Sequence, residues 1–241
     1  LSTSPHDGNL KARWVEKSEL NRLKERWQSL EANAMQTSFC HQFSYLAPAL
    51  NHLASDKVKL LVVERLNDGS DDDANSGSDL SGSELVGLLP IEFKKVCGLF
   101  LKGAEVWKHD QAFDTTPLLH RDFAADAWRT VCEFLAAENV SLFSLNTVSA
   151  EPQMESVLRL IQENLQLPRF QRDHFQRAAL RPVESVEVYR QQFCSKKARN
   201  KHSRLLKKLA QEGDVSWCVH STDSDSDWER LTEEFLRLEG S

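Results

Sequence analysis

The sequence lacks the features of a membrane protein, a secreted protein and a metalloprotein. It has no run of 18 or more apolar residues, so no integral membrane segment is expected. Residues 1–6 have neither the basic start nor the apolar core of a signal peptide. The five cysteines are scattered without a CxxC pair, which argues against disulfides and a zinc site. These absences predict a cytoplasmic protein that holds no metal.

Common catalytic motifs are absent as well. The chain has no Ser/His/Asp triad pattern, no Walker phosphate loop and no histidine cluster with metal-ligand spacing. Any chemistry therefore has to be inferred from the fold and from the residues that the fold brings together.

Acidic charge is concentrated in one segment, residues 67–84. The segment holds six carboxylates and no Lys or Arg, and the formal net charge of the whole chain is -6, so the remainder is neutral. A calcium loop of the EF-hand type does not fit, because Ser76 and Gly82 stand where glycine and glutamate are required. We expect a flexible acidic loop and no general attraction for basic partners.

Hydrophobic periodicity predicts a mixed succession of strands and helices in the first three quarters of the chain. Ser18 is expected to cap the first helix, and Pro48 to kink or restart the second. The predicted elements are a strand at 11–16, helices at 19–32 and within 39–54, strands at 58–66, 84–93 and 96–107, a helix closed by Asn139, a strand at 140–148, a helix from Pro152 and a strand at 169–181.

This order of elements looks like the fold of the GCN5-related N-acetyltransferases (GNAT). Two helices precede a meander of three antiparallel strands, and helices and strands then alternate, so the fold class is α/β with a mixed (α+β) sheet. The resemblance implies that the loop after the fourth strand cradles the pyrophosphate of acyl-CoA with glycine-rich backbone. Residues 108–122, which correspond to that loop, contain no glycine.

The last quarter of the chain restarts the pattern. Residues 195–211 form a basic helix with an apolar face, residues 214–220 a strand, and a capping box at 226–229 opens a helix that reaches Glu239. We therefore expect an N-terminal GNAT-like domain at 11–183 and the incomplete start of a second GNAT-like domain at 184–241.

Several short motifs stand out in the second half of the chain and before it. They are Tyr189, Phe193, SKKAR at 195–199, LAQEG at 209–213 and FLRLE at 235–239, together with His109, Asp110 and TPLL at 116–119. In these motifs the sequence resembles the CelD/BcsL family of GNAT-type acetyltransferases, which are tandem, FemAB-like double GNAT proteins associated with cellulose biosynthesis.

The resemblance implies an acyl-CoA-dependent N-acyltransferase linked to cellulose or another exopolysaccharide. Acetyl-CoA or another acyl-CoA is the expected co-substrate, and the acceptor is a small-molecule or glycan-linked amine. The region expected to bind acyl-CoA would follow Ser241, so residues 1–241 alone are expected to be inactive. A FemAB-like aminoacyl transferase and a non-catalytic assembly module are the alternatives.

Two sets of polar residues are candidates for the site. His109, Asp110 and Asp114 could deprotonate an amine, and the simpler alternative is a polar loop with a satisfied histidine. Arg199, Lys201 and Arg204 could attract the CoA phosphates, although an ordinary solvated helix face would look the same. A nucleic acid partner is not expected, but binding of this basic helix to a nucleic acid or an anionic surface remains a third hypothesis.

Overall fold

The computed structural model describes residues 10–66, 83–96, 101–176, 183–216 and 225–240. The chain divides into two compact units, unit 1 at residues 1–172 and unit 2 at residues 173–241. The predicted domain boundary, after residue 183, falls slightly later in the sequence. That residues 184–241 begin a second GNAT-like domain stays a prediction.

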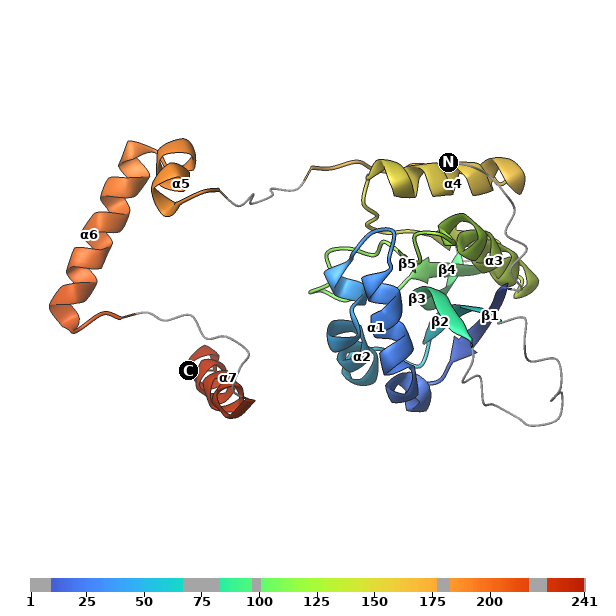
Figure 1. The fold of residues 1–241 in the computed structure, drawn as a ribbon, viewed down its shortest axis with the longest axis horizontal. Helices are drawn as coiled ribbons and strands as arrows, with labels where there is room; N and C mark the ends of the chain where they lie inside the picture. Colours follow the sequence, from blue (N-terminus) through green and yellow to red (C-terminus); the bar gives the residue numbers. More distant parts are fainter. Residues whose placement is uncertain (1–9, 67–82, 97–100, 177–182, 217–224, 241) are drawn as a thin grey trace. The chain divides into compact units, whose positions relative to one another are not determined.

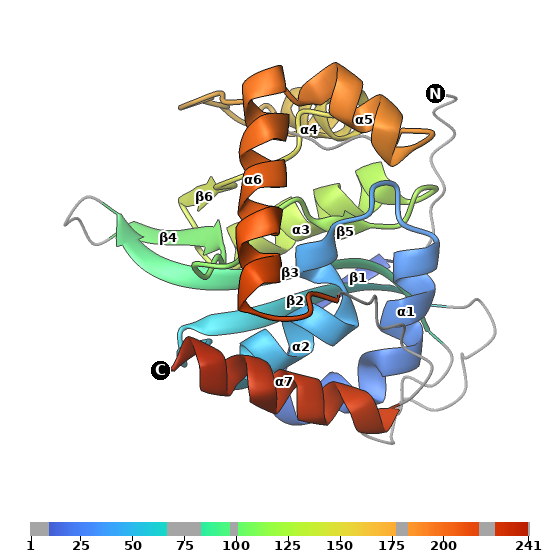
Figure 2. The same ribbon diagram turned by 90° about the vertical axis from the view of Figure 1, so that its left-hand side faces the viewer.

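Unit 1 is built on a mixed sheet whose strands follow the order β1-β2-β3-β4-β6 (Figure 1 and Figure 2). The first four strands pair antiparallel, whereas β4 and β6 are parallel. A short strand, β5, pairs with β3 outside this path. The strands are β1 (Leu10–Val15), β2 (Val58–Arg65), β3 (Glu84–Val96), β4 (Leu101–Val106), β5 (Leu118–Leu119) and β6 (Leu142–Ser144).

Helices cover both faces of this sheet (Figure 2). One face packs against α1 (Lys24–Ala32) and α2 (Phe43–His52), and the other against α3 (Ala124–Ala137) and α4 (Pro152–Asn164). Burial on both faces explains why β2 is apolar at consecutive positions rather than at alternate ones. The predicted α/β fold with a mixed sheet is confirmed, as is the order of two helices before an antiparallel meander, followed by a helix, a strand and a helix.

The first two helical segments each begin with 3-10 turns. The first, η1 (Lys17–Leu23), starts one residue before the predicted cap, because Glu16 and Glu19 form a reciprocal capping box in place of Ser18. The second, η2 (Phe39–His41), precedes α2. Pro48 lies inside α2 and is exposed, so it does not begin a new helix.

Several predicted boundaries in the rest of unit 1 were wrong. Val96 ends β3 and does not begin the next strand, and β6 covers only three residues of the predicted 140–148. Residues 169–176 form no strand, since they are exposed and pair with no other segment that the structure describes. Asn139 closes α3 as predicted, with a left-handed φ of 60°. The acidic segment lies outside the described residues, except for residues 83 and 84.

Unit 2 contributes three helices, α5 (Val186–Phe193), α6 (Lys196–Glu212) and α7 (Asp225–Glu239). The sequence predicted α6 and α7 but not α5. Ser226 lies within α7 and therefore is not its cap, and residues 214–216 form no strand, while 217–220 lie outside the described residues. In unit 2, every residue whose burial is described is exposed or half-buried. Among the described helices of the chain, none is both long and apolar enough to cross a membrane.

Candidate functional site

The candidate site lies where β4 and β6 end. Because these two neighbours are parallel, their carboxyl ends meet at the same edge of the sheet, next to the antiparallel part of the meander. The region outside the carboxyl ends of parallel strands is a common place for ligands in α/β sheets. Two polar segments follow the strands at this edge, residues 107–117 after β4 and residues 145–149 after β6.

Hydrogen bonds join these two segments to each other. Thr115 donates its backbone N–H to the carbonyl oxygen of Thr147 at 2.8 Å, and the Thr147 N–H donates back to Thr115 Oγ1 at 3.0 Å. Ser149 donates its N–H to Thr116 Oγ1 at 2.8 Å. Asn146 adds a bond to the end of β4, with its Nδ2 3.3 Å from the carbonyl oxygen of Val106. The edge is therefore held together by the chain's own threonines and asparagine.

Among the predicted catalytic residues, His109 has a buried ring nitrogen with no hydrogen-bond partner in the described part of the chain. Its Nδ1 lies 3.2 Å from Gln111 Oε1, and the nitrogen without a described partner is its Nε2. If Nδ1–H donates to the Gln111 oxygen, the neutral ring carries its lone pair on Nε2. The ring is placed by Trp107 and Tyr45, at centroid distances of 5.2 and 5.6 Å.

Asp114 and Asp110 lie in different environments from His109. Asp114 Oδ1 accepts hydrogen bonds from the backbone N–H of Thr116 at 2.9 Å and from its hydroxyl at 2.6 Å, which fixes the turn before β5. Asp110 is exposed in a turn of the same loop. Catalytic roles for these two carboxylates stay predictions.

Aromatic side chains surround the outer side of this loop. Phe39 lies 4.6 Å from Tyr45 and stacks on Phe113 at 6.5 Å between centroids, and the Tyr45 hydroxyl donates to the Gln111 carbonyl oxygen at 3.0 Å. The sequence did not single out Tyr45, Gln111 or Asn146. The position of Asn146 near the end of a predicted strand was a signal that could have marked it as a site residue. Nothing in the sequence indicated that α2 would contact residues 109–113.

The connection between α1 and α2 runs along the same loop and adds a buried histidine. His41 is 2% exposed, and its Nδ1 lies 2.6 Å from the carbonyl oxygen of Thr116. Burial lowers the pKa of His41 from 6.5 to about 4, and the bond to Thr116 and the charge of Asp114 offset that shift only in part. His41 is therefore neutral at pH 7.

The backbone of the loop after β4 offers no phosphate cradle of the expected kind. It has no glycine, and no residue from 107 to 123 adopts a left-handed φ, so successive N–H groups do not form an anion-binding nest. The predicted phosphate-binding cations Arg199, Lys201 and Arg204 are exposed on α6 of unit 2. Within the described residues, no group of three or more His, Cys, Asp or Glu side chains could hold a metal ion.

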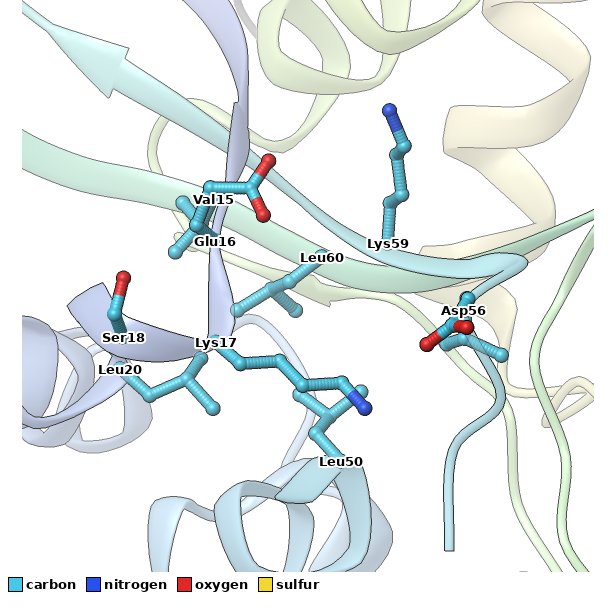
Figure 3. A pocket seen from close by; sticks show the side chains of 10 residues that line it. Val15, Glu16, Lys17, Ser18, Leu20, Leu50, Asp56, Lys59 and Leu60 are labelled. Carbon is cyan, nitrogen blue, oxygen red and sulfur yellow. The ribbon is translucent and has the colours of Figure 1, made fainter.

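A separate surface pocket of about 340 Å³ lies where β1 ends and β2 begins (Figure 3). Its walls are the apolar ends of these strands and of η1 and α2. Its polar residues, Glu16, Lys17, Ser18, Asp56 and Lys59, are all exposed, and the Lys17 ammonium donates to the Ala54 carbonyl oxygen at 3.0 Å. No histidine lines this pocket, and it is built from strand ends other than those of the candidate site.

No protein-family model and no curated protein sequence match the chain. Solved acetyltransferase structures are similar to it in fold. A ribosomal-protein-alanine N-acetyltransferase from Brucella melitensis is 13% identical with a TM-score of 0.38, over 71% of this chain and 99% of that one. An aminoglycoside acetyltransferase from an uncultured soil sample, in complex with sisomicin, is 11% identical with a TM-score of 0.40, over 71% and 97%. A GNAT family acetyltransferase from Staphylococcus aureus is 12% identical with a TM-score of 0.40, over 70% and 98%. At these identities the similarity indicates nothing about substrate.

Proposed function

We propose that the protein is an acyl-CoA-dependent N-acyltransferase of the GNAT type, with its reaction at the ends of β4 and β6. The observation that carries the proposal is the buried Nε2 of His109, which has no partner among the described residues and lies in the loop where the two parallel strands end. A buried lone pair held in this way costs free energy unless a ligand uses it. An amine proton of an acceptor is the partner that a general base requires.

The chemistry that follows is direct transfer. The acceptor nitrogen attacks the thioester carbonyl, a C–N bond forms, and the C–S bond breaks to release the CoA thiolate. The amine proton passes to His109 Nε2, and Gln111 keeps the ring oriented through Nδ1. Backbone N–H groups would polarise the carbonyl, as in other acyl transfers.

The substrates belong to the proposal too. Acetyl-CoA or another acyl-CoA is the co-substrate, and a small-molecule or glycan-linked amine is the acceptor. Arg199, Lys201 and Arg204 are proposed to attract the CoA phosphates. The link to cellulose or other exopolysaccharide synthesis and the cytoplasmic location are proposed from the sequence alone.

A non-catalytic assembly module is the second candidate. Two observations favour it, namely the glycine-free loop and the hydrogen bonds through which Thr115 and Thr116 close the edge between β4 and β6. A domain that only recognises a partner needs no path for a thioester along this edge. The two candidates differ in whether acyl-CoA binds at all.

Substitution of His109 tests the proposed reaction. In the full-length protein with acetyl-CoA and a panel of amines, His109→Asn should lower kcat about 100-fold, because proton transfer by a positioned base contributes on that order. The affinity for acetyl-CoA, measured by calorimetry, should stay unchanged. His52→Asn, at an exposed histidine at the end of α2, is the matched control. Transfer by His109→Asn at the wild-type rate would exclude His109 as the base.

A further inference from the structure

Helix α6 presents an unusually dense cationic surface. Seven of its 17 residues are Lys or Arg and only Glu212 is acidic, and all of these side chains are exposed. None of the ion pairs found among the described residues involves a Lys or Arg side chain of α6. The basic face consists of Lys196, Lys197, Arg199, Lys201, Arg204, Lys207 and Lys208.

The remaining side of α6 is apolar and also exposed. Ala198, His202, Leu205 and Leu209 follow one another at spacings of four, three and four residues, and Leu206 lies beside them on the helix surface. Leu205, Leu206 and Leu209 are 47%, 56% and 52% exposed. We call these three residues the leucine stripe.

A helix with one strongly cationic side and one exposed leucine side matches the boundary between water and an anionic lipid surface. The leucines enter the acyl region while the cations remain at the headgroups, where each Lys or Arg adds to the attraction. Seventeen residues correspond to a length of about 25 Å lying in the plane of the surface.

We propose that α6 binds the surface of an anionic membrane as a peripheral, amphipathic helix. A nucleic acid fits less well, because phosphate contacts use the cations but leave the leucine stripe in water. Helix α5, which precedes α6 by two residues, adds Phe193, which is 62% exposed, and Tyr189, whose ring lies 5.2 Å from it. Aromatic rings of this kind favour the membrane interface.

The chain contains a competitor for the same surface. Helix α7 is acidic, with six Asp or Glu residues against Arg230 and Arg237. Its own apolar side chains Phe235 and Leu236 are 58% and 62% exposed, as the leucine stripe is, which is not expected of two helices packed against each other. Packing of α7 over the leucine stripe of α6 is nevertheless the alternative that the experiment below distinguishes from membrane binding.

The test is co-sedimentation of the full chain with vesicles of phosphatidylcholine, with and without phosphatidylglycerol. Binding should require the anionic lipid and weaken between about 0.05 M and about 0.3 M salt. The double substitution Leu205→Ser with Leu209→Ser should reduce binding about tenfold, as should Lys197→Gln combined with Lys207→Gln and Lys208→Gln.

Matched controls separate specific effects from general ones. Leu236→Ser removes a similarly exposed leucine from α7. Replacing the exposed Lys11, Lys24 and Lys57 of unit 1 with Gln makes the same charge change outside α6. Neither control should alter vesicle binding.

Three results would overturn the proposal. They are no sedimentation with anionic vesicles at low salt, vesicle binding that appears only when α7 is removed, and retention on duplex DNA that the leucine substitutions leave unchanged. None of these measurements depends on acyl transfer, so the membrane proposal and the proposed enzymatic function can fail separately.

Discussion

At the scale of single residues, His41 links the stability of the fold to pH. The neutral ring is buried and donates from Nδ1 to the Thr116 carbonyl oxygen, and its pKa in the folded protein is about 4 against an ordinary value of 6.5. Between these values the unfolded chain binds a proton that the folded protein does not. The contribution of His41 to stability is therefore complete above pH 6.5 and is lost as the pH falls toward 4.

Comparison with a variant measures this effect. Between pH 7 and pH 4.5 the wild type should lose about 2 kcal/mol more unfolding free energy than His41→Gln, which cannot titrate and can still donate to Thr116. Urea denaturation at both pH values gives the difference. Equal losses in the two proteins would show that His41 does not titrate with a depressed pKa.

Residue chemistry could be predicted from the sequence only in part. His109 was found because it follows a predicted strand in a polar loop. Its orientation by Gln111 and Tyr45 depends on how closely α2 approaches that loop, which no local pattern encodes. Asp114 was expected to be a catalytic candidate, but the structure engages one of its oxygens with Thr116, two residues away.

At the scale of elements, a buried ion cluster ties β1 and α1 to β2. Glu64, on β2, is 2% exposed and accepts from Arg13 Nε at 3.0 Å and from Arg26 at 2.8 Å. Replacing Glu64 takes away the charged partner of Arg26, while Arg13 keeps its ion pair with Glu19 at 3.0 Å. Losing one member of a buried ion pair costs more free energy than losing an exposed pair.

Glu64→Gln should therefore lower the free energy of unfolding by about 3 kcal/mol. Glu138→Gln breaks the half-exposed pair with Lys102 and should cost less than about 1 kcal/mol. Denaturant titration of both variants checks the comparison, and equal costs would mean that the Glu64 cluster is effectively solvated.

Elements with long, regular patterns were predicted, the exposed helices α6 and α7 included, whereas the short elements α5 and β5 were not. The hairpin of β2 and β3 and the helices α3 and α4 follow directly from periodicity, because burial selects the pattern. The two-residue β5 depends on pairing with Gly87 and Leu88 of β3, a long-range contact. Residues 169–176 hold only two apolar residues, Phe170 and Phe175, and form no strand, since no described segment pairs with them.

At the scale of the whole molecule, the buried hydrophobic clusters found among the described residues lie in unit 1. Both clusters of buried residues belong to its sheet and helices, whereas α5 and α6 bury no residue. Acyl transfer is proposed at the ends of β4 and β6, and attachment to an anionic surface through α6, whose Arg199, Lys201 and Arg204 are also the cations proposed to attract the CoA phosphates. His109 and the leucine stripe can be altered independently.

If the protein is an acyltransferase, it binds acyl-CoA, and calorimetric titration of acetyl-CoA into the protein tests this most directly. The acyltransferase proposal predicts saturable binding at one site per chain, with a dissociation constant on the order of micromolar to millimolar. The absence of binding heat at millimolar acetyl-CoA, in protein shown to be folded by circular dichroism, would contradict the proposal and favour the assembly module.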